Sequence, residues 1–350
     1  MNNNKRICDY GFTVGTMSKG PLNKITDVPG VTVGHCTIDT AESKTGVTVI
    51  LPCEDNPFAR KLTAAAFVHN GFGKTQGIPQ VEELGTLETP IALTNTLNIG
   101  KVHDAMVGYM LDRCEKEGVK CTSINPVVGE CNDSILNKIA VRAVEAHHVQ
   151  AAIEGACKDF EEGDVGAGKS TVCFGLKGGI GSASRLVTVG EKTYTIGVLV
   201  QSNFGATETF TLCGNHIGPM LKEKITPADL DRGSIMMIVG TDLPVSDRQL
   251  KRIIRRCGVG LSRTGSFMGH GSGDIMLGFT TANRIESEPQ SGIQAIEILQ
   301  ESLLGQAFTA CAEATEEAIL NSMAMAHTCT GFDGTVKHSL TDIYLITLGK

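Results

Sequence analysis

The sequence lacks the patterns that would bring a metal ion or a disulfide framework into its function. It contains no tryptophan, and aromatic residues make up only 5% of its 350 residues. None of its twelve cysteines stands in a C-x-x-C pair, and its nine histidines form no H-E-x-x-H motif. We therefore expect no metal and no cofactor, and we interpret the cysteines as free, buried thiols of a reducing compartment.

Positive charge and long apolar runs are also scarce. Thirty-one Lys and Arg residues face 38 Asp and Glu residues, so the formal net charge is −7, and nucleic acid is not an expected partner. The first residues are polar with no hydrophobic segment behind them, and no apolar run approaches the length of a membrane span. These absences predict a soluble, cytoplasmic protein that does not associate with a membrane.

Glycine, in contrast, is abundant. The chain has 41 glycines, well above the usual share of about 7%, which indicates many positions of close backbone approach or positive φ. No internal repeat and no clean boundary divides the chain, so we treat residues 1–350 as one domain.

The hydrophobic patterns predict mixed strands and helices. Strands are expected at 31–38, 46–51, 64–69, 234–239, 275–280 and 342–348, a hairpin at 185–201, and helices at 103–117, at 134–148, after Ser246 and within 292–326. Because the helices cluster instead of alternating with strands, the pattern favours a layered α+β fold over a doubly wound parallel sheet.

One segment matches a nucleotide-binding pattern in full. Residues Gly163 to Ser170 read G-x-x-x-x-G-K-S, the phosphate-loop pattern. Such a loop must follow a buried strand and open a helix, whereas the residues before it are charged and those after it are rich in glycine. A nucleotide-binding protein stays an alternative of a different class, testable by ATP or GTP binding to the protein and to Lys169→Ala.

A glycine-serine pair precedes the apolar strand at 235–239. In N-terminal-nucleophile hydrolases a serine hydroxyl attacks the preceding carbonyl, the chain breaks, and the new α-amine serves as the base for that hydroxyl. An α-amine titrates near neutral pH. Gly233 would leave its carbonyl open to attack, so Gly233-Ser234 is a candidate for self-cleavage.

Further polar residues stand at strand ends and glycine turns, where a rigid scaffold can hold them over a pocket. Asn203 follows an apolar strand and could donate to an oxyanion, and Glu130 could pair with an ammonium group. Ser272 and Asp274 lie in a glycine-rich turn before another strand. Taken singly, each of these residues is more often a turn or cap residue.

Several of these segments, taken in chain order, resemble one family. They are Ile25-Thr26-Asp27-Val28-Pro29-Gly30-Val31, His69-Asn70-Gly71-Phe72-Gly73, Thr94-Asn95-Thr96, Pro126-Val127-Val128-Gly129-Glu130, residues 174–185, Val198 to Gly205, Gly233-Ser234 and Gly271-Ser272-Gly273-Asp274. The chain is similar in these segments to the DmpA-type aminopeptidases, the L-aminopeptidase/D-esterase group that includes the β-peptidyl aminopeptidases. The resemblance runs over nearly the whole chain.

The resemblance implies a four-layer αββα sandwich of the kind shared with ornithine acetyltransferases. It implies a precursor that cleaves itself into residues 1–233 and 234–350, and a homotetramer of such processed pairs. Ser234 is similar to the family nucleophile and Asn203 to the asparagine that stabilises the oxyanion. Glu130 corresponds to the acid that holds the substrate's amino group, and Ser272 and Asp274 to residues that hydrogen-bond near the nucleophile.

Two positions depart from the family pattern. The β-peptidase branch carries glutamate where this chain has Asp274, whose side chain is shorter. Family members often carry a tyrosine where this chain has Ile135, so the hydrogen bond of that tyrosine must be absent or supplied elsewhere. Ile135 is therefore expected in the substrate-binding site without the polar role.

The resemblance implies an aminopeptidase that acts on short peptides, amides or esters with a free amino terminus. One alternative is an acyltransferase of the ornithine acetyltransferase type, which uses threonine where this chain has Ser234. Another is an unprocessed, inactive binding protein, against which the joint presence of Ser234, Asn203 and Glu130 argues.

Overall fold

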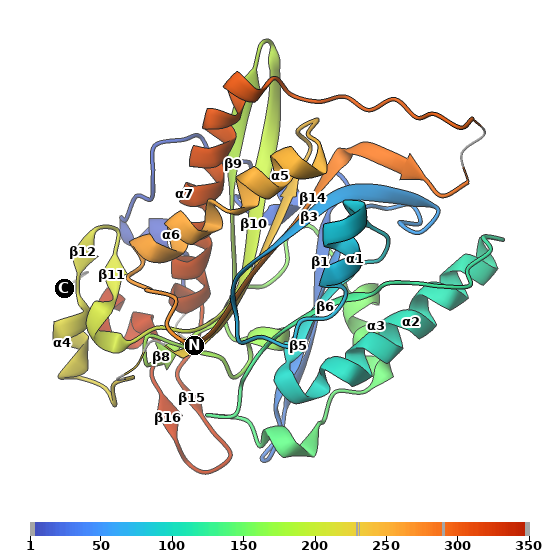
Figure 1. The fold of residues 1–350 in the computed structure, drawn as a ribbon. Coiled ribbons are helices and arrows are strands. Elements are labelled where there is room, and N and C mark those ends of the chain that lie inside the picture. Colours follow the sequence, from blue (N-terminus) through green and yellow to red (C-terminus); the bar gives the residue numbers. More distant parts are fainter. Residues whose placement is uncertain (1–3, 229, 231, 289–290, 347–350) are drawn as a thin grey trace.

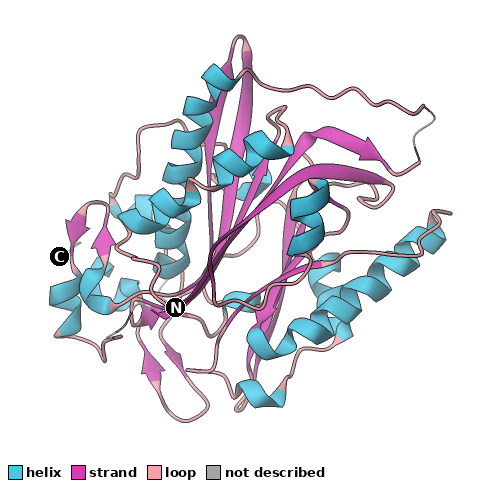
Figure 2. Ribbon diagram, viewed as in Figure 1, coloured by secondary structure: helices cyan, strands magenta, loops and turns pink. Residues whose placement is uncertain are grey.

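Two β-sheets pack face to face at the centre of the computed structural model (Figure 1, Figure 2). The structure describes residues 4–228, 230, 232–288 and 291–346. The smaller sheet has the order β1 (Thr32–Asp39), β2 (Lys44–Leu51), β5 (Ile91–Asn95), β6 (Val127–Cys131). The larger sheet has the order β4 (Thr86–Leu87), β3 (Arg60–Gly71), β14 (Gly271–Glu286), β13 (Arg232–Thr241), β10 (Lys192–Asn203), β9 (Gly179–Val189). Within these two sheets, only the pairs β5–β6 and β13–β14 are parallel.

Helices cover the outer faces of both sheets. The larger sheet is covered by α5 (Asp247–Ile254), α6 (Cys257–Arg263) and α7 (Leu304–Ala324), and the smaller sheet by α2 (Ile99–Lys116) and α3 (Ala146–Glu154). The remaining helices are α1 (Ile78–Leu84) and α4 (Gly218–Lys222). The remaining strands form three short pairs: β7 (Val172–Cys173) with β8 (Leu176–Lys177), β11 (Thr211–Leu212) with β12 (Asn215–His216), and β15 (Cys329–Thr330) with β16 (Val336–Lys337).

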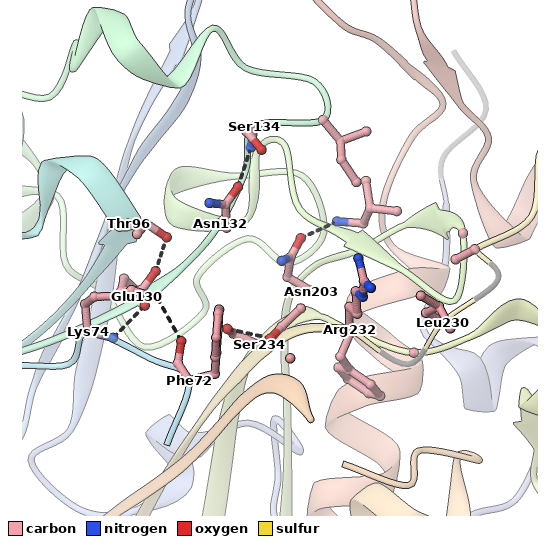
Figure 3. A pocket seen from close by; sticks show the side chains of 18 residues that line it. Phe72, Lys74, Thr96, Glu130, Asn132, Ser134, Asn203, Leu230, Arg232 and Ser234 are labelled. Carbon is pink, nitrogen blue, oxygen red and sulfur yellow. Dashed lines mark hydrogen bonds between the residues drawn. The ribbon is translucent and has the colours of Figure 1, made fainter. Parts of the chain in front are cut away.

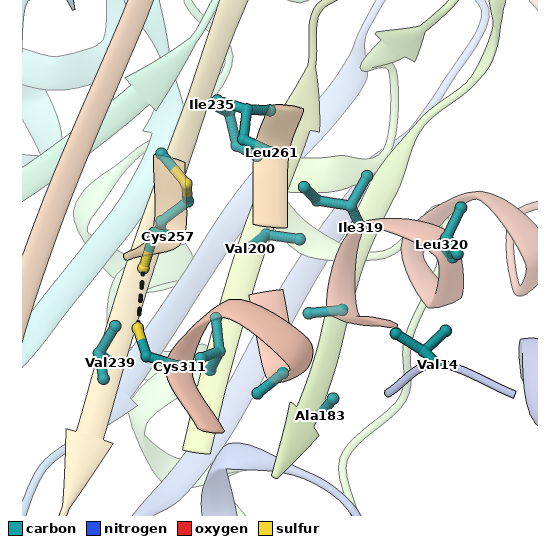
Figure 4. Packing of buried hydrophobic residues seen from close by; sticks show 14 of the residues in the cluster. Val14, Ala183, Val200, Ile235, Val239, Cys257, Leu261, Cys311, Ile319 and Leu320 are labelled. Carbon is teal, nitrogen blue, oxygen red and sulfur yellow. Dashed lines mark hydrogen bonds between the residues drawn. The ribbon is translucent and has the colours of Figure 1, made fainter. Parts of the chain in front are cut away.

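The buried apolar side chains form one cluster at each of the three interfaces between the helix and sheet layers. One cluster joins the larger sheet to the helices α5–α7, and Figure 4 shows α7 residues such as Ile319 beside strand residues such as Val200. A second cluster lies between the two sheets, and a third lies between the smaller sheet and α2 and α3. The expected αββα sandwich is confirmed, because the layers run helix, sheet, sheet, helix.

Glycine lets helices lie directly on strands. A β-carbon on Gly34 of β1 would lie 1.9 Å from the Ala152 carbonyl oxygen of α3. One on Gly181 of β9 would lie 2.0 Å from the Ala318 carbonyl oxygen of α7. These close approaches account for part of the glycine surplus, and they leave little room for large aromatic side chains between the layers.

Local signals in the sequence are confirmed where they are strong. The hairpin expected at 185–201 is β9 and β10, which turn at Gly190 with φ +60°. Ser246 caps α5, since its Oγ accepts from the Gln249 N–H at 3.2 Å while the Gln249 side chain accepts from the Ser246 N–H. No helix in the described ranges is both long and apolar enough to cross a bilayer. All twelve cysteines are free thiols, but the expectation that they are buried holds for only seven of them: four are partly buried and Cys157 is exposed.

Two predicted elements are wrong. Residues 134–148 are not one helix, because Asn137 bonds back to Asp133 in a turn and Arg142 adopts φ +52°, which ends the short helical segment Ile139–Val141. Residues 342–348 are not a strand as far as they are described: Thr341–Leu345 is helical, and its start is held by the Ser339 hydroxyl, which accepts from the Asp342 N–H. Residues 347 and 348 lie outside the described residues.

A third predicted element, the helix within 292–326, is only half right. It begins at Leu304. The segment before it is extended, because the Asn283 side chain bonds the backbone of Glu297 in both directions and the Leu299 N–H donates to Pro244.

The phosphate-loop match has a different structural role. Gly163 forms an isolated bridge with Ile180 on the larger sheet, and the short β7 and β8 strands follow where a phosphate loop would open a helix. Lys169 is ion-paired with Asp39 and Asp164 at 2.9 and 3.2 Å. Its ammonium group is therefore engaged by two carboxylates of the chain itself, which does not fit phosphate binding.

Candidate active site

Ser234 lies at the start of the central strand β13, between two neighbours that leave it room. In the sheet register it faces Asn203 of β10 on one side and Gly273 of β14 on the other. A β-carbon on Gly273 would lie 3.0 Å from the Ser234 Oγ, so glycine at 273 keeps space for the hydroxyl. Ser234 is 6% exposed and lines a cavity of about 510 Å³.

The residue before Ser234 is a glycine in an unusual backbone conformation. Gly233 has φ +118°, a region that side-chain-bearing residues rarely adopt, and a β-carbon there would lie 1.9 Å from the Asn203 carbonyl oxygen. The Ser234 hydroxyl donates to the Gly233 carbonyl oxygen at 2.7 Å. Only glycine fits this position, and the hydroxyl lies against the peptide group that it would attack.

Asn203 points its amide toward the same cavity from the end of β10 (Figure 3). Its Oδ1 accepts from the Val172 N–H of β7 at 2.9 Å. This bond fixes which way the amide points, and the Nδ2 hydrogens, the only donors of the amide, can donate to a bound group. Sheet register thus places one side-chain donor next to the serine hydroxyl.

Glu130 reaches the cavity from β6 of the other sheet (Figure 3). One carboxylate oxygen accepts from the Lys74 N–H at 2.8 Å, and the other accepts from the Thr96 hydroxyl. The Lys74 ammonium is directed elsewhere, donating to the Phe72 carbonyl at 2.9 Å. Glu130 is 2% exposed, and no described side chain forms a salt bridge with it. A ligand ammonium would supply the missing positive charge.

Ser272 and Asp274 lie behind the nucleophile and do not line the cavity. They are fully buried on β14, in register with Gly233 and Ile235, the two neighbours of Ser234. The Ser272 hydroxyl donates to the Asp274 carboxylate at 2.8 Å. They were expected to hydrogen-bond near the nucleophile; their bond joins them to each other, next to β13 and outside the residues that line the cavity.

Ile135 lies at the cavity mouth and is 45% exposed. Its turn is held by the Asn132 side chain, which accepts from the Ser134 N–H at 3.0 Å. Ile135 brings an apolar surface and no hydrogen-bond donor, so the polar groups of the mouth come from Asn132 and Ser134, which also line the cavity.

The sequence assigned no role to several residues of the site. Thr96 and the Lys74 backbone hold Glu130, and Arg232 lines the cavity beside Gly233. The parallel pairing of β5 with β6 sets Thr94 against Glu130, which brings Thr96 to the same strand ends. A hydroxyl directly after a buried strand was the available signal, yet the strand that pairs with it cannot be identified from one sequence.

Cys131 lies directly beneath the serine and is not a competing nucleophile. Its thiol donates to the carbonyl oxygens of Ser234 and Gln201 at 3.3 and 3.4 Å, and burial raises its pKa well above the ordinary value. The buried thiol therefore stays protonated. Within the described ranges, no cluster of His, Cys, Asp and Glu side chains could hold a metal ion.

Comparison with known proteins agrees with this geometry. The model of peptidase family S58 matches residues 23–337. The chain belongs to peptidase family S58. A relative within it, the beta-peptidyl aminopeptidase BapA of Sphingosinicella microcystinivorans, is 36% identical over 342 residues, which cover 90% of this chain and 84% of the relative.

Solved structures extend the comparison. The PH0078 protein of Pyrococcus horikoshii OT3 superposes with a TM-score of 0.92 at 46% identity, over 98% of this chain and 97% of the other. The L-aminopeptidase D-Ala-esterase/amidase of Ochrobactrum anthropi superposes with a TM-score of 0.89 at 33% identity, over 96% and 95%. The latter is described as a prototype of the serine aminopeptidases and a variant of the Ntn hydrolase fold.

Membership of family S58 supports the reaction expected from the sequence. The chain is an aminopeptidase of the serine type, a hydrolase of peptide or amide bonds. The comparisons favour neither the acyltransferase nor the nucleotide-binding alternative.

Proposed function

We propose that Ser234 becomes an N-terminal nucleophile by cleavage of the Gly233–Ser234 bond. The Ser234 Oγ attacks the Gly233 carbonyl carbon, the peptide nitrogen leaves as the Ser234 α-amine, and Gly233 is held as an ester. Water hydrolyses the ester and leaves a carboxylate on Gly233. The observation that carries the proposal is the hydroxyl of Ser234 at 2.7 Å from the Gly233 carbonyl oxygen, at a glycine with φ +118°.

The same residues support the peptidase reaction. The substrate ammonium pairs with Glu130, and Ser234 Oγ attacks the first carbonyl while its own α-amine takes the proton. The oxyanion accepts from Asn203 Nδ2. The amine product leaves, and water resolves the acyl-enzyme. Ser272 and Asp274 act as positioning residues on β14, beside β13, and Ile135 packs against the substrate at the cavity mouth.

The proposed substrates are short peptides, amides or esters with a free amino terminus. A relative is named a beta-peptidyl aminopeptidase, and another is named an L-aminopeptidase and D-Ala-esterase. The cavity mixes the Glu130 carboxylate with apolar residues such as Phe72 and Ile135, which suits an ammonium group carrying an apolar side chain.

We further propose a cytoplasmic homotetramer of processed pairs. Exposed isoleucines of the extended segment before α7, Ile293, Ile296 and Ile298, support an interface between copies. Light scattering should give roughly 150 kDa for such a tetramer of 37.0 kDa precursors.

Intact mass under denaturing conditions tests the cleavage. Freshly purified wild type should split from 37.0 kDa into pieces of about 25 and about 12 kDa, in proportion to 233 and 117 residues. Ser234→Ala should stay whole and lack peptidase activity. A wild type that remains one 37.0 kDa chain after long incubation, yet hydrolyses peptides, would overturn the proposal.

A further inference from the structure

A second cavity, of about 440 Å³, lies between the connector that leads to Gly233 and the strand β16. Its described lining consists of Gly175, residues 223–226 and residues 336–338. Three of these can carry positive charge, Lys224, Lys337 and His338, whereas Glu223 is the one acidic residue in that described lining. Gly175 also lines the active-site cavity, so the two cavities share one turn of the β7–β8 pair.

Lys337 is the unusual residue of this cavity. Lys337 is 9% exposed, and no described residue accepts a hydrogen bond from its ammonium group or forms an ion pair with it. Burial lowers its pKa, with no neighbouring carboxylate to oppose the effect. Its Nζ is not among the solvent-excluded side-chain atoms that lack a partner. It therefore reaches the solvent of the cavity, where an anionic acceptor could pair with it.

Lys177, on the neighbouring strand β8, shows how this fold satisfies a buried ammonium when no ligand is involved. Its backbone N–H donates to the His338 carbonyl at 2.8 Å, so the two strands touch. Its Nζ donates to three backbone carbonyls, those of Gly168, Thr171 and Gly178, at 2.9 to 3.0 Å. Lys337 has no such set of carbonyls and faces a cavity instead.

We propose that this cavity is a binding site for a small oxyanion, a carboxylate or phosphate group, held by Lys337 Nζ and faced by Lys224 and His338. Lys224 and Lys337 together exceed Glu223 by one formal positive charge, which matches a single oxyanion. An anion on Lys337 would join β16 to the connector, and the connector continues into Ala228 and Leu230 at the wall of the active site.

Two sources can supply this oxyanion. One is a free solute. The other is the carboxylate that self-cleavage would create on Gly233, seven residues after Thr226 and therefore within a chain reach of about 23 Å at most. The second source rests on the proposed self-cleavage, whereas the first does not.

Isothermal titration with sodium phosphate and with sodium acetate, at constant ionic strength, tests the site. The uncut Ser234→Ala protein should bind at least one of them saturably. Adding Lys337→Met should weaken that affinity by about tenfold or more, since a charge-assisted bond is lost. Adding Lys192→Met, which removes an exposed lysine of the β9–β10 turn, should leave the affinity within about twofold.

Lys337→Arg separates loss of charge from misfolding, because it should bind within a few-fold of the parent and melt at a similar temperature. Wild type then distinguishes the sources. Equal binding by cleaved and uncut protein would identify a free solute, and binding by the uncut form alone would identify the Gly233 carboxylate. A wild type that fails to cleave would overturn the proposed self-cleavage but not this site. Absence of saturable binding by the uncut protein, or equal binding by Lys337→Met, would overturn the site.

Discussion

Glu130 is a buried carboxylate whose described partners are a backbone N–H and a hydroxyl, both uncharged. If it holds the substrate ammonium, Glu130→Gln should raise KM for a substrate with a free amine about 10- to 100-fold, the range for one hydrogen bond between charged groups. The cleavage at Gly233 should proceed as in wild type, because it involves no ammonium. Steady-state kinetics and intact mass measure the two effects.

The controls for this prediction are a matched variant and a matched substrate. Glu115→Gln, on the exposed face of α2, should leave KM unchanged. An N-acetylated peptide should be a very poor substrate of wild type. Turnover of the acetylated peptide at the rate of the free one would contradict the role of Glu130.

Lys177 makes stability depend on pH. Burial lowers its pKa to about 8, against the opposing effect of Asp164. Between about pH 8 and the unfolded value near 10.5, the unfolded chain binds the proton that the folded chain has released, so this group makes the folded state more stable as pH rises. Relative to Lys177→Met, the free energy of unfolding of wild type should rise by roughly 3 kcal/mol over that pH interval.

Urea unfolding of both proteins at pH 7.5, 9 and 10.5 measures the difference, and other titrating groups cancel in it. The prediction would fail if the two free energies of unfolding ran parallel with pH.

At the scale of elements, α7 is joined to β9 by a buried ion cluster. Arg185 bonds Glu313 at 3.1 Å and Glu317 at 2.7 Å, and the Arg185 side chain has no exposure. Arg185→Met would leave the buried Glu313 without a salt bridge and Glu317 with Lys19 as its remaining one, so the free energy of unfolding should fall by about 3–5 kcal/mol. Lys138→Met, which breaks the exposed pair with Glu42, should change stability by less than about 1 kcal/mol. Chemical denaturation measures the free energy of unfolding of both variants. Equal losses would contradict the stabilising role of the buried ion cluster.

Elements with a complete local signal could be predicted from the sequence. The β9–β10 hairpin has its glycine turn, and α5 has both halves of its capping box. Residues 134–148 have helical spacing, but the Asp133–Asn137 bond and the positive φ of Arg142 outweigh it. The segment before α7 is held extended by Asn283, a partner more than ten residues away that periodicity does not reveal.

The same distinction applies to the site. Ser234, Asn203 and Glu130 are found by motif and resemblance, and all three line one cavity. The roles of Thr96, the Lys74 backbone and Arg232 depend on which strands pair and how the two sheets stack. Ser272 and Asp274 were expected near the nucleophile, and only register places them behind it.

At the scale of the whole molecule, the larger sheet interleaves the two proposed fragments. Residues after 233 supply β14 and all of β13 but its first two residues. Residues before 234 supply β3 and β4 on one side and β10 and β9 on the other. The cleaved fragments should therefore leave a size-exclusion column in one peak, at the volume of uncut Ser234→Ala, and separate only in denaturant. Fragments that separate under native conditions would contradict this arrangement.

The central position of β13 also orders events in time. In the unfolded chain, only the peptide bond holds Gly233 beside Ser234. In the folded protein, the pairing of β13 with β10 and β14 also holds the two residues together. A gene split at this point would begin its second product with an initiator methionine and would require two incomplete sheets to meet by diffusion. On the proposed mechanism, the Gly233–Ser234 peptide bond must stay intact while the chain folds. The free α-amine of Ser234 can form only after folding has brought the hydroxyl and the carbonyl into place.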